Sequence, residues 1–217
     1  MKISRISLGL AVLALSLSGN ALADFGVGFK AGTLGLGVEG RYKPLPNIDV
    51  RVGANVYDYE DTDTRAGVNY DSTLNLETFY ATANLSFPLS PLRLTAGLFS
   101  NGNEVNLTSV DSATFDIGGN TYTAADVGTL SSTTSFGSTS PYVGIGYDFE
   151  IFGKVGLNLD LGLLWQGEPE VSLLADGLLA NDPGFQSALE AERQQLEDDI
   201  SDYKAWPVIS LGFVYNF

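Results

Sequence analysis

Residues 205–217 read AWPVISLGFVYNF and indicate the architecture of the whole chain. Alternate positions on one face of this segment are large and apolar, namely Ile209, Leu211, Phe213, Tyr215 and Phe217. The opposite face is small or polar apart from Val214, and it carries Ser210, Gly212 and Asn216. An alternation of period two that ends on an aromatic residue is typical of a strand with one face in lipid and the other in a polar interior. On a soluble protein the same stripe would be an aggregation hazard at a sheet edge.

Residues 1–23 predict a secretory signal peptide. Lys2 and Arg5 form its positive end, residues 6–17 its apolar centre, and Ala21-Leu22-Ala23 a small-x-small cleavage site. A membrane anchor is the alternative, but the apolar run is shorter than the ~20 residues that a helical span needs. We therefore expect residues 1–23 to be removed and residues 24–217 to form one domain, a transmembrane β-barrel.

The composition excludes several classes of site. The 217 residues include no cysteine and no histidine, which removes disulfides, thiolate and imidazole metal ligands and the commonest general base. The net charge of −15 opposes binding to nucleic acid, which we do not expect as a partner. The sequence also lacks a Gly-x-Ser-x-Gly elbow and a phosphate-binding loop. We expect no catalytic residues, no enzymatic activity, no metal and no cofactor.

Eight stretches share the alternation of the last segment. They cover residues 25–33, 34–43, 48–56, 68–87, 92–98, 143–149, 155–166 and 205–217. Tight turns at residues 44–47, 89–91 and 152–154 alternate with long connections at residues 58–69, 105–138 and 168–203. The pattern predicts an all-β fold, an eight-stranded antiparallel up-and-down transmembrane β-barrel with periplasmic ends and a short helix in the last extracellular loop. We expect it in the outer membrane of a Gram-negative bacterium, surrounded by outer-membrane lipid. A soluble, lipocalin-like barrel with its apolar face inward is the alternative.

Two features of this pattern leave alternatives open. Within residues 68–87 the apolar phase slips near Glu77, which either a β-bulge or an upper part standing above the membrane would explain. Within residues 184–203, one helical stripe is predicted by the spacing of Phe185, Leu189, Leu196 and Ile200. That helix either folds onto the rim of the barrel or serves as a lid or a receptor-facing element.

The polar faces of the eight stretches predict what fills the barrel. With the apolar faces in lipid, a network of charged side chains points inward: Glu39, Arg41, Asp49, Arg51, Glu77, Arg93, Asp148 and Asp160. Buried charges without partners are costly, so we expect ion pairs among them. Because eight strands leave an interior that side chains nearly fill, the network either plugs the barrel or lines a narrow conduit. In the second case an acidic excess would attract a small cationic solute.

The end of the chain carries a further resemblance. Phe213, Tyr215 and Phe217 resemble the C-terminal membrane-insertion signal of bacterial outer-membrane barrels. This resemblance implies the outer-membrane assembly machinery and periplasmic chaperones as partners during biogenesis.

Several short motifs resemble one family of outer-membrane barrels. They are Ile117-Gly118-Gly119-Asn120-Thr121-Tyr122, the segments at residues 140–146 and 166–173, the acidic helix around residues 190–193, and Trp206-Pro207-Val208. Their order and spacing are similar to those of the CarO-type (carbapenem-resistance-associated, ornithine-uptake) family. The resemblance implies an eight-stranded barrel that passes small basic amino acids. The expected function is therefore a narrow channel for small solutes, and the alternative is a closed barrel with a structural or cell-surface interaction role.

Overall fold

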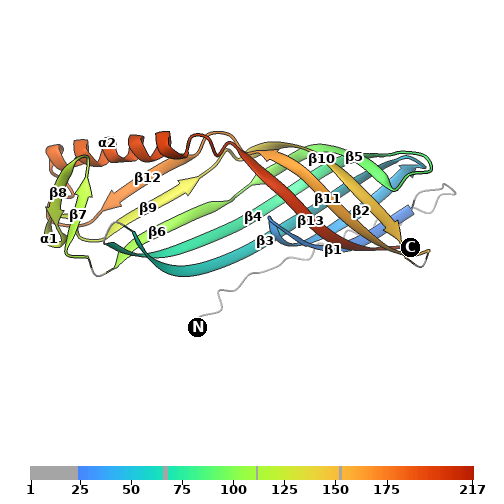
Figure 1. Cartoon of the computed structure of the whole chain (residues 1–217), viewed down its shortest axis with the longest axis horizontal. Coiled ribbons are helices and arrows are strands. Elements are labelled where there is room, and N and C mark those ends of the chain that lie inside the picture. The colour runs from blue at the N-terminus through green and yellow to red at the C-terminus, as the bar shows by residue number, and fades with distance from the viewer. Residues whose placement is uncertain (1–23, 66–67, 111, 152) are drawn as a thin grey trace.

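The computed structural model describes residues 24–65, 68–110, 112–151 and 153–217, and most of them lie in strands (Figure 1). The expected signal peptide lies outside these ranges. Eight strands form a barrel: β1 (Asp24–Gly32), β2 (Gly35–Leu45), β3 (Ile48–Arg65), β4 (Val68–Ser86), β5 (Leu92–Asn101), β10 (Thr139–Glu150), β11 (Val155–Trp165) and β13 (Ala205–Asn216). Each is antiparallel to the next, and β13 pairs with β1, so the barrel is closed and the predicted fold is confirmed. No helix in the described ranges is long and apolar enough to cross a membrane.

The barrel turns its apolar faces outward. On β13, Ile209 and Leu211 are 52% and 58% exposed, whereas Ser210 between them is 6% exposed. The same alternation places Phe29 of β1 and Leu161 of β11 on the outside. An apolar outer face and a polar interior are opposite to the lipocalin-like alternative, which is therefore wrong. A closed barrel with such a surface leaves no strand edge in lipid and spans an outer membrane.

The long connections are folded, contrary to the expectation of loops. Between β5 and β10 lie β6 (Glu104–Val110), β7 (Thr114–Ile117), β8 (Asn120–Thr123), α1 (Ala124–Val127) and β9 (Leu130–Ser135). Between β11 and β13 lie β12 (Glu170–Ala175) and α2 (Pro183–Ile200), and α2 is the short helix predicted for the last loop. Together these elements form an extension beyond the barrel, at the end opposite the C-terminus (Figure 1).

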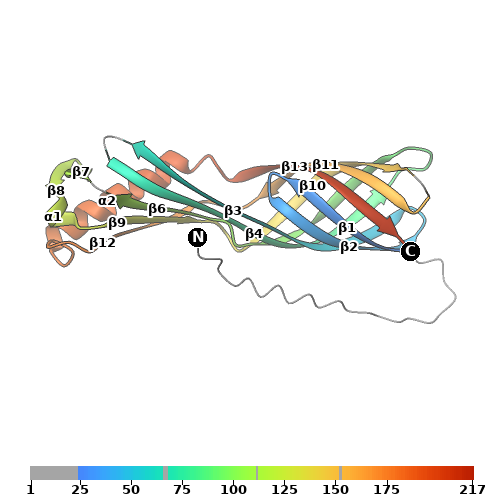
Figure 2. The same cartoon turned by 90° about the horizontal axis from the view of Figure 1, so that it is seen from below.

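The extension continues the barrel wall through two long strands. β3 and β4 pair without interruption from Ile48–Leu85 to Arg65–Val68, so of the two alternatives for the phase slip near Glu77 the bulge is absent. On the edge away from β3, β4 pairs with two different strands. Residues 78–86 pair with β5 inside the barrel, and residues 69–75 pair with β6 in the extension. β9 and β12 follow β6 in the same sheet, and Figure 2 shows β3 and β4 running from the barrel into the extension. The phase slip thus marks the point where β4 rises above the barrel.

The described residues form two separate apolar clusters. One lies in the extension, where Phe185 of α2 packs with Phe115 and Val127. The other lies inside the barrel toward the extension, where Tyr80, Phe99 and neighbouring side chains meet. Barrel and extension therefore have independent cores.

Helix α2 begins at a defined cap, which gives a first prediction. The carboxylate of Asp182 accepts hydrogen bonds from the backbone N–H groups of Gly184 and Phe185, both at 2.9 Å. Asp182→Ala removes this acceptor and is expected to destabilise α2 by about 0.5–2 kcal/mol. Hydrogen exchange of the α2 amides should accelerate, while Asp182→Asn, which keeps a capping oxygen, should stay close to the parent. Equal exchange in the alanine variant would contradict the capping role.

Candidate functional site

The barrel interior is crossed by two arginines on neighbouring walls. Arg51 of β3 is 2% exposed. Its guanidinium contacts three carboxylates: Asp49 at 2.9 Å, Glu39 at 3.4 Å and Asp148 at 3.2 Å. Because a guanidinium offers donors in a planar fork, one side chain can tie three strands together. Arg51 therefore links β2, β3 and β10 across the interior.

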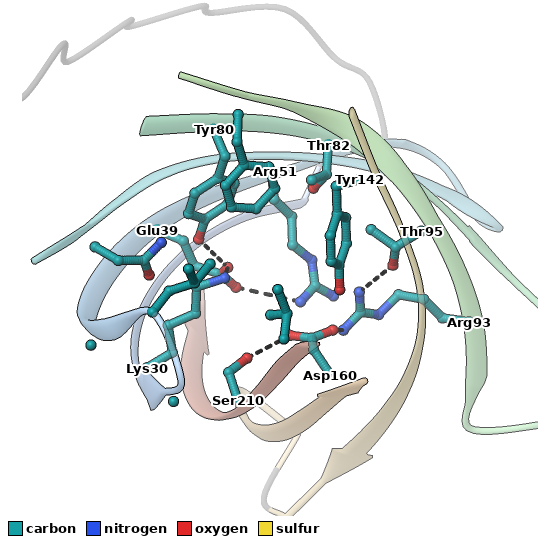
Figure 3. A pocket seen from close by; sticks show the side chains of 16 residues that line it. Lys30, Glu39, Arg51, Tyr80, Thr82, Arg93, Thr95, Tyr142, Asp160 and Ser210 are labelled. Carbon is teal, nitrogen blue, oxygen red and sulfur yellow. Dashed lines mark hydrogen bonds and ion pairs between the residues drawn. The ribbon is translucent and has the colours of Figure 1, made fainter. Parts of the chain in front are cut away.

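The second arginine, Arg93 of β5, is also 2% exposed and is fully engaged. Its Nε donates to Asp148 at 3.1 Å, and one terminal nitrogen donates to Asn84 at 2.8 Å and Thr95 at 2.9 Å. The other terminal nitrogen contacts Asp160 at 2.5 Å (Figure 3). Asp148 thus bridges the two arginines, and the network has few unsatisfied groups.

Glycine makes room for this network. A Cβ built on Gly146 of β10 would overlap the guanidinium of Arg93, so this position accepts no larger residue without displacing the arginine. The sequence alternation of β10 put Gly146 on the inner face, and its small size is what allows Arg93 to lie flat against the wall.

Three residues outside the predicted set of charged side chains complete the network, and one of them, Ser210, was already expected on the inner face of its strand. Lys30 of β1 contacts Glu39 at 3.4 Å and lies 4.1 Å from the ring centroid of Tyr80. The hydroxyl of Tyr80 donates to Glu39 at 2.9 Å, and that of Ser210 to Asp160 at 3.4 Å (Figure 3). The signal for Lys30 was present, since it follows the outward Phe29 and so shares the inner face with Gly26 and Gly28.

Seven of the eight charged residues predicted for the interior lie there, and Glu77 does not. Glu77 is exposed, on the same face of β4 as the outward Phe79, because the unbroken pairing of β3 and β4 keeps odd positions outside. The other seven are Glu39, Arg41, Asp49, Arg51, Arg93, Asp148 and Asp160. With Lys30 added, the network has equal numbers of basic and acidic side chains in the described ranges, so the predicted acidic excess is absent.

An apolar layer covers the network on the side of the extension. It consists of Leu34, Tyr80, Phe99, Tyr142, Leu164 and Val208. Ring centroids lie 4.9 Å apart for Tyr80 and Phe99 and 5.2 Å apart for Phe99 and Tyr142. Between this layer and the arginines a cavity of about 30 Å³ remains. Such a volume holds roughly one or two water molecules.

The opposite end of the barrel is more open. A cavity of about 340 Å³ there is bordered by Arg41, Lys43, Asp148 and Glu150. The side chain of Asp148 is 27% exposed, whereas that of Arg93 beside it is 2% exposed. By the usual asymmetry of such barrels, the end with the tight turns faces the periplasm. Solvent therefore reaches the network from the periplasmic side and stops at the arginines.

Ion pairs also organise the outer face of α2. Arg193 contacts Glu190 at 2.6 Å and Glu197 at 2.5 Å, one turn before and one turn after it. Hydrogen bonds from Arg193 and Gln194 lower the pKa of Glu190 to about 2. In the described part of the chain, no cluster of three or more acidic side chains is arranged to hold a metal ion.

The residues predicted as an insertion signal lie on the outer surface of β13. Phe213, Tyr215 and Phe217 are 46%, 41% and 72% exposed, and the rings of the last two are in edge-to-face contact. Their role in membrane insertion stays a prediction.

Comparisons with known proteins support the architecture. No protein-family model matches the sequence, and no curated protein matches it. Two solved structures from Acinetobacter baumannii are similar over most of their length. CarO2 has a TM-score of 0.61 and 21% identity, covering 89% of this chain and 98% of its own. CarO has a TM-score of 0.56 and 23% identity, covering 88% and 97%. The chain therefore has the fold of the CarO-type outer-membrane β-barrels, as its motifs predicted.

Proposed function

We propose that this protein is a closed outer-membrane barrel that carries an interaction module at the cell surface. The observation that carries the proposal is the filled interior, where Arg51 and Arg93 are each 2% exposed and only about 30 Å³ stays empty beneath the apolar layer. A solute would have to break several charge-assisted hydrogen bonds and also displace the aromatic rings. The folded extension, with its own core, supports a function outside the barrel.

Planar-bilayer recording of the refolded mature protein tests the proposal. We expect no stable unitary conductance at neutral pH, because two layers of side chains block the path. Reproducible single-channel steps from the unmodified protein would overturn it.

A second candidate function is passage of small solutes, among them basic amino acids, through an opened interior. The observation that favours it is the periplasmic cavity of about 340 Å³, which reaches Asp148. Asp148 holds both arginines, so its release would be the first step of opening. The equal charges of the network give little preference for cations over anions.

Asp148→Asn distinguishes the two functions. For a closed barrel we expect this variant to stay silent in bilayers, because the rings of Tyr80, Phe99 and Tyr142 still cover the interior. Conductance that appears in Asp148→Asn, but not in Glu150→Gln at the same end, would favour passage of solutes. Glu150 is a suitable control because its side chain is exposed and borders the same cavity.

A further inference from the structure

A large cavity lies where the extension meets the outer end of the barrel. Its volume is about 540 Å³, within the range of typical small-molecule sites. Leu107 of β6 and Thr134 of β9 form one wall, Leu196 and Ile200 of α2 another, and Trp206 of β13 lies on the barrel side. The cavity therefore joins three parts of the chain that are distant in sequence.

The two halves of the apolar stripe on α2 have different surroundings. Phe185 and Leu189 are 1% and 4% exposed, because they pack into the core of the extension. Leu196 and Ile200 continue the same stripe but line the cavity. Their apolar surfaces face a space that no described side chain fills. The second half of α2 therefore has an apolar face that borders the cavity and does not pack into the core of the extension.

The cavity wall carries no charge. All of its lining residues are apolar or neutral polar. The nearby carboxylate of Glu197 is held elsewhere, since it accepts a hydrogen bond from the backbone N–H of Val171 at 2.9 Å and contacts Arg193. Transfer of an ion into such a site would be costly without an opposite charge. The chemistry of the wall therefore favours a neutral molecule.

Two lining residues carry buried polar atoms that lack a hydrogen-bond partner. Gln166 is 2% exposed, and its amide nitrogen donates to the carbonyl of Tyr203 at 3.2 Å, but its Oε1 has no donor. The indole Nε1 of Trp206 has no acceptor. Buried polar atoms are nearly always paired. An unpaired acceptor and an unpaired donor in two residues of one cavity wall therefore indicate that these side chains turn toward the cavity when it holds a polar group.

We propose that this cavity binds a small neutral amphipathic molecule with an apolar body and one hydroxyl or carboxamide group. The body contacts Leu107, Leu196 and Ile200. The side chains of Trp206 and Gln166, whose unpaired atoms are covered in this structure, rotate so that the polar group accepts from Trp206 Nε1 and donates to Gln166 Oε1. Hydroxyl and amide groups can do both at once, whereas a carboxylate cannot donate. The inference deepens the proposed surface role and rests on it.

Binding is tested on the refolded mature protein in phospholipid bilayers with 1-octanol and octanamide as probes. Octane and octanoate at neutral pH serve as matched compounds without the donor–acceptor group. Trp165→Phe leaves Trp206 as the sole tryptophan, so its emission reports occupancy. We expect saturable binding of both probes, and at least about tenfold weaker binding of octane and octanoate, because neither satisfies Gln166.

Variants separate the site from partition into lipid. Gln166→Met keeps the shape of the wall but removes the acceptor, and it should weaken octanol binding roughly 2- to 10-fold. Trp206→Phe, followed by calorimetry, should do the same for the donor. Leu196→Arg should abolish binding, whereas Leu178→Arg, at a position 81% exposed, should leave it unchanged.

Three results would overturn the inference: non-saturable uptake, equal affinity for octane and octanol, or unchanged affinity in both Gln166→Met and Trp206→Phe. Conductance recorded on the same preparations keeps the two proposals distinct. A silent barrel that binds neither probe rejects the ligand site and leaves the closed barrel intact, whereas a conducting barrel rejects the closed state whatever the probes do.

Discussion

Arg93→Met is expected to lower the free energy of unfolding by about 3–5 kcal/mol. The substitution removes a guanidinium that is 2% exposed and leaves the carboxylates of Asp148 and Asp160 without one of their partners in the barrel interior. Uncompensated buried charge is what makes the loss large, since methionine retains much of the apolar volume of the side chain. Urea titration of the protein refolded in phospholipid vesicles measures it.

Arg193→Met is the matched control, because it applies the same change to an arginine that makes two ion pairs on the surface of α2. Solvent screens these pairs, so we expect a much smaller loss than at Arg93. The double variant Arg93→Met with Asp160→Asn should recover part of the lost stability, because it removes one of the carboxylates left behind. Similar losses at the two arginines, or no recovery in the double variant, would contradict the buried network.

Leu161→Arg is expected to destabilise the barrel by about 2–4 kcal/mol, the cost of an arginine on the lipid face near the middle of the membrane. Leu161 lies on the outer face of β11, between Ile145 of β10 and Ile209 of β13. These three side chains, on three adjacent strands, are all apolar and exposed, as expected for contact with acyl chains. Vesicle-based urea titration again gives the free energy.

The same leucine-to-arginine change at Leu174 of β12 is the control for lipid contact. Leu174 is 67% exposed, more than the 41% of Leu161, but it lies in the extension outside the barrel. A surface substitution in water should change stability by less than about 0.5 kcal/mol. Equal effects at Leu161 and Leu174 would mean that exposure alone, without lipid, explains the outer face.

The sequence predicted the barrel because period-two patterns depend only on neighbouring residues. Leu157 to Trp165 and Ile209 to Phe217 alternate so regularly that the inner face of each strand follows at once, and with it the inward Asp160. Glu77 shows the limit of this reasoning. Its phase depends on whether β4 pairs with β3 without a bulge, which is a property of two strands and not of one.

Apart from α2, the elements of the extension escaped prediction for a different reason. β9 reads LSSTTS, without an apolar stripe, since it is a strand only through its pairing with β6 and β12. The unpaired atoms of Gln166 and Trp206 were equally hidden, because whether a polar atom finds a partner is decided by tertiary packing. Gln166 ends the alternating segment of residues 155–166, and it is buried at the junction with the extension.

The unbroken pairing of β3 and β4 fixes how far the extension projects from the barrel. Beyond Val56, the last residue of β3 paired with β2, the strand continues to Arg65. At a rise of about 3.3 Å per residue, this segment spans roughly 30 Å. The polar headgroup layer on one side of a bilayer is only about 5–8 Å thick. β3 and β4 therefore form a continuous two-stranded support, which holds the outer end of the extension at a set distance from the lipid.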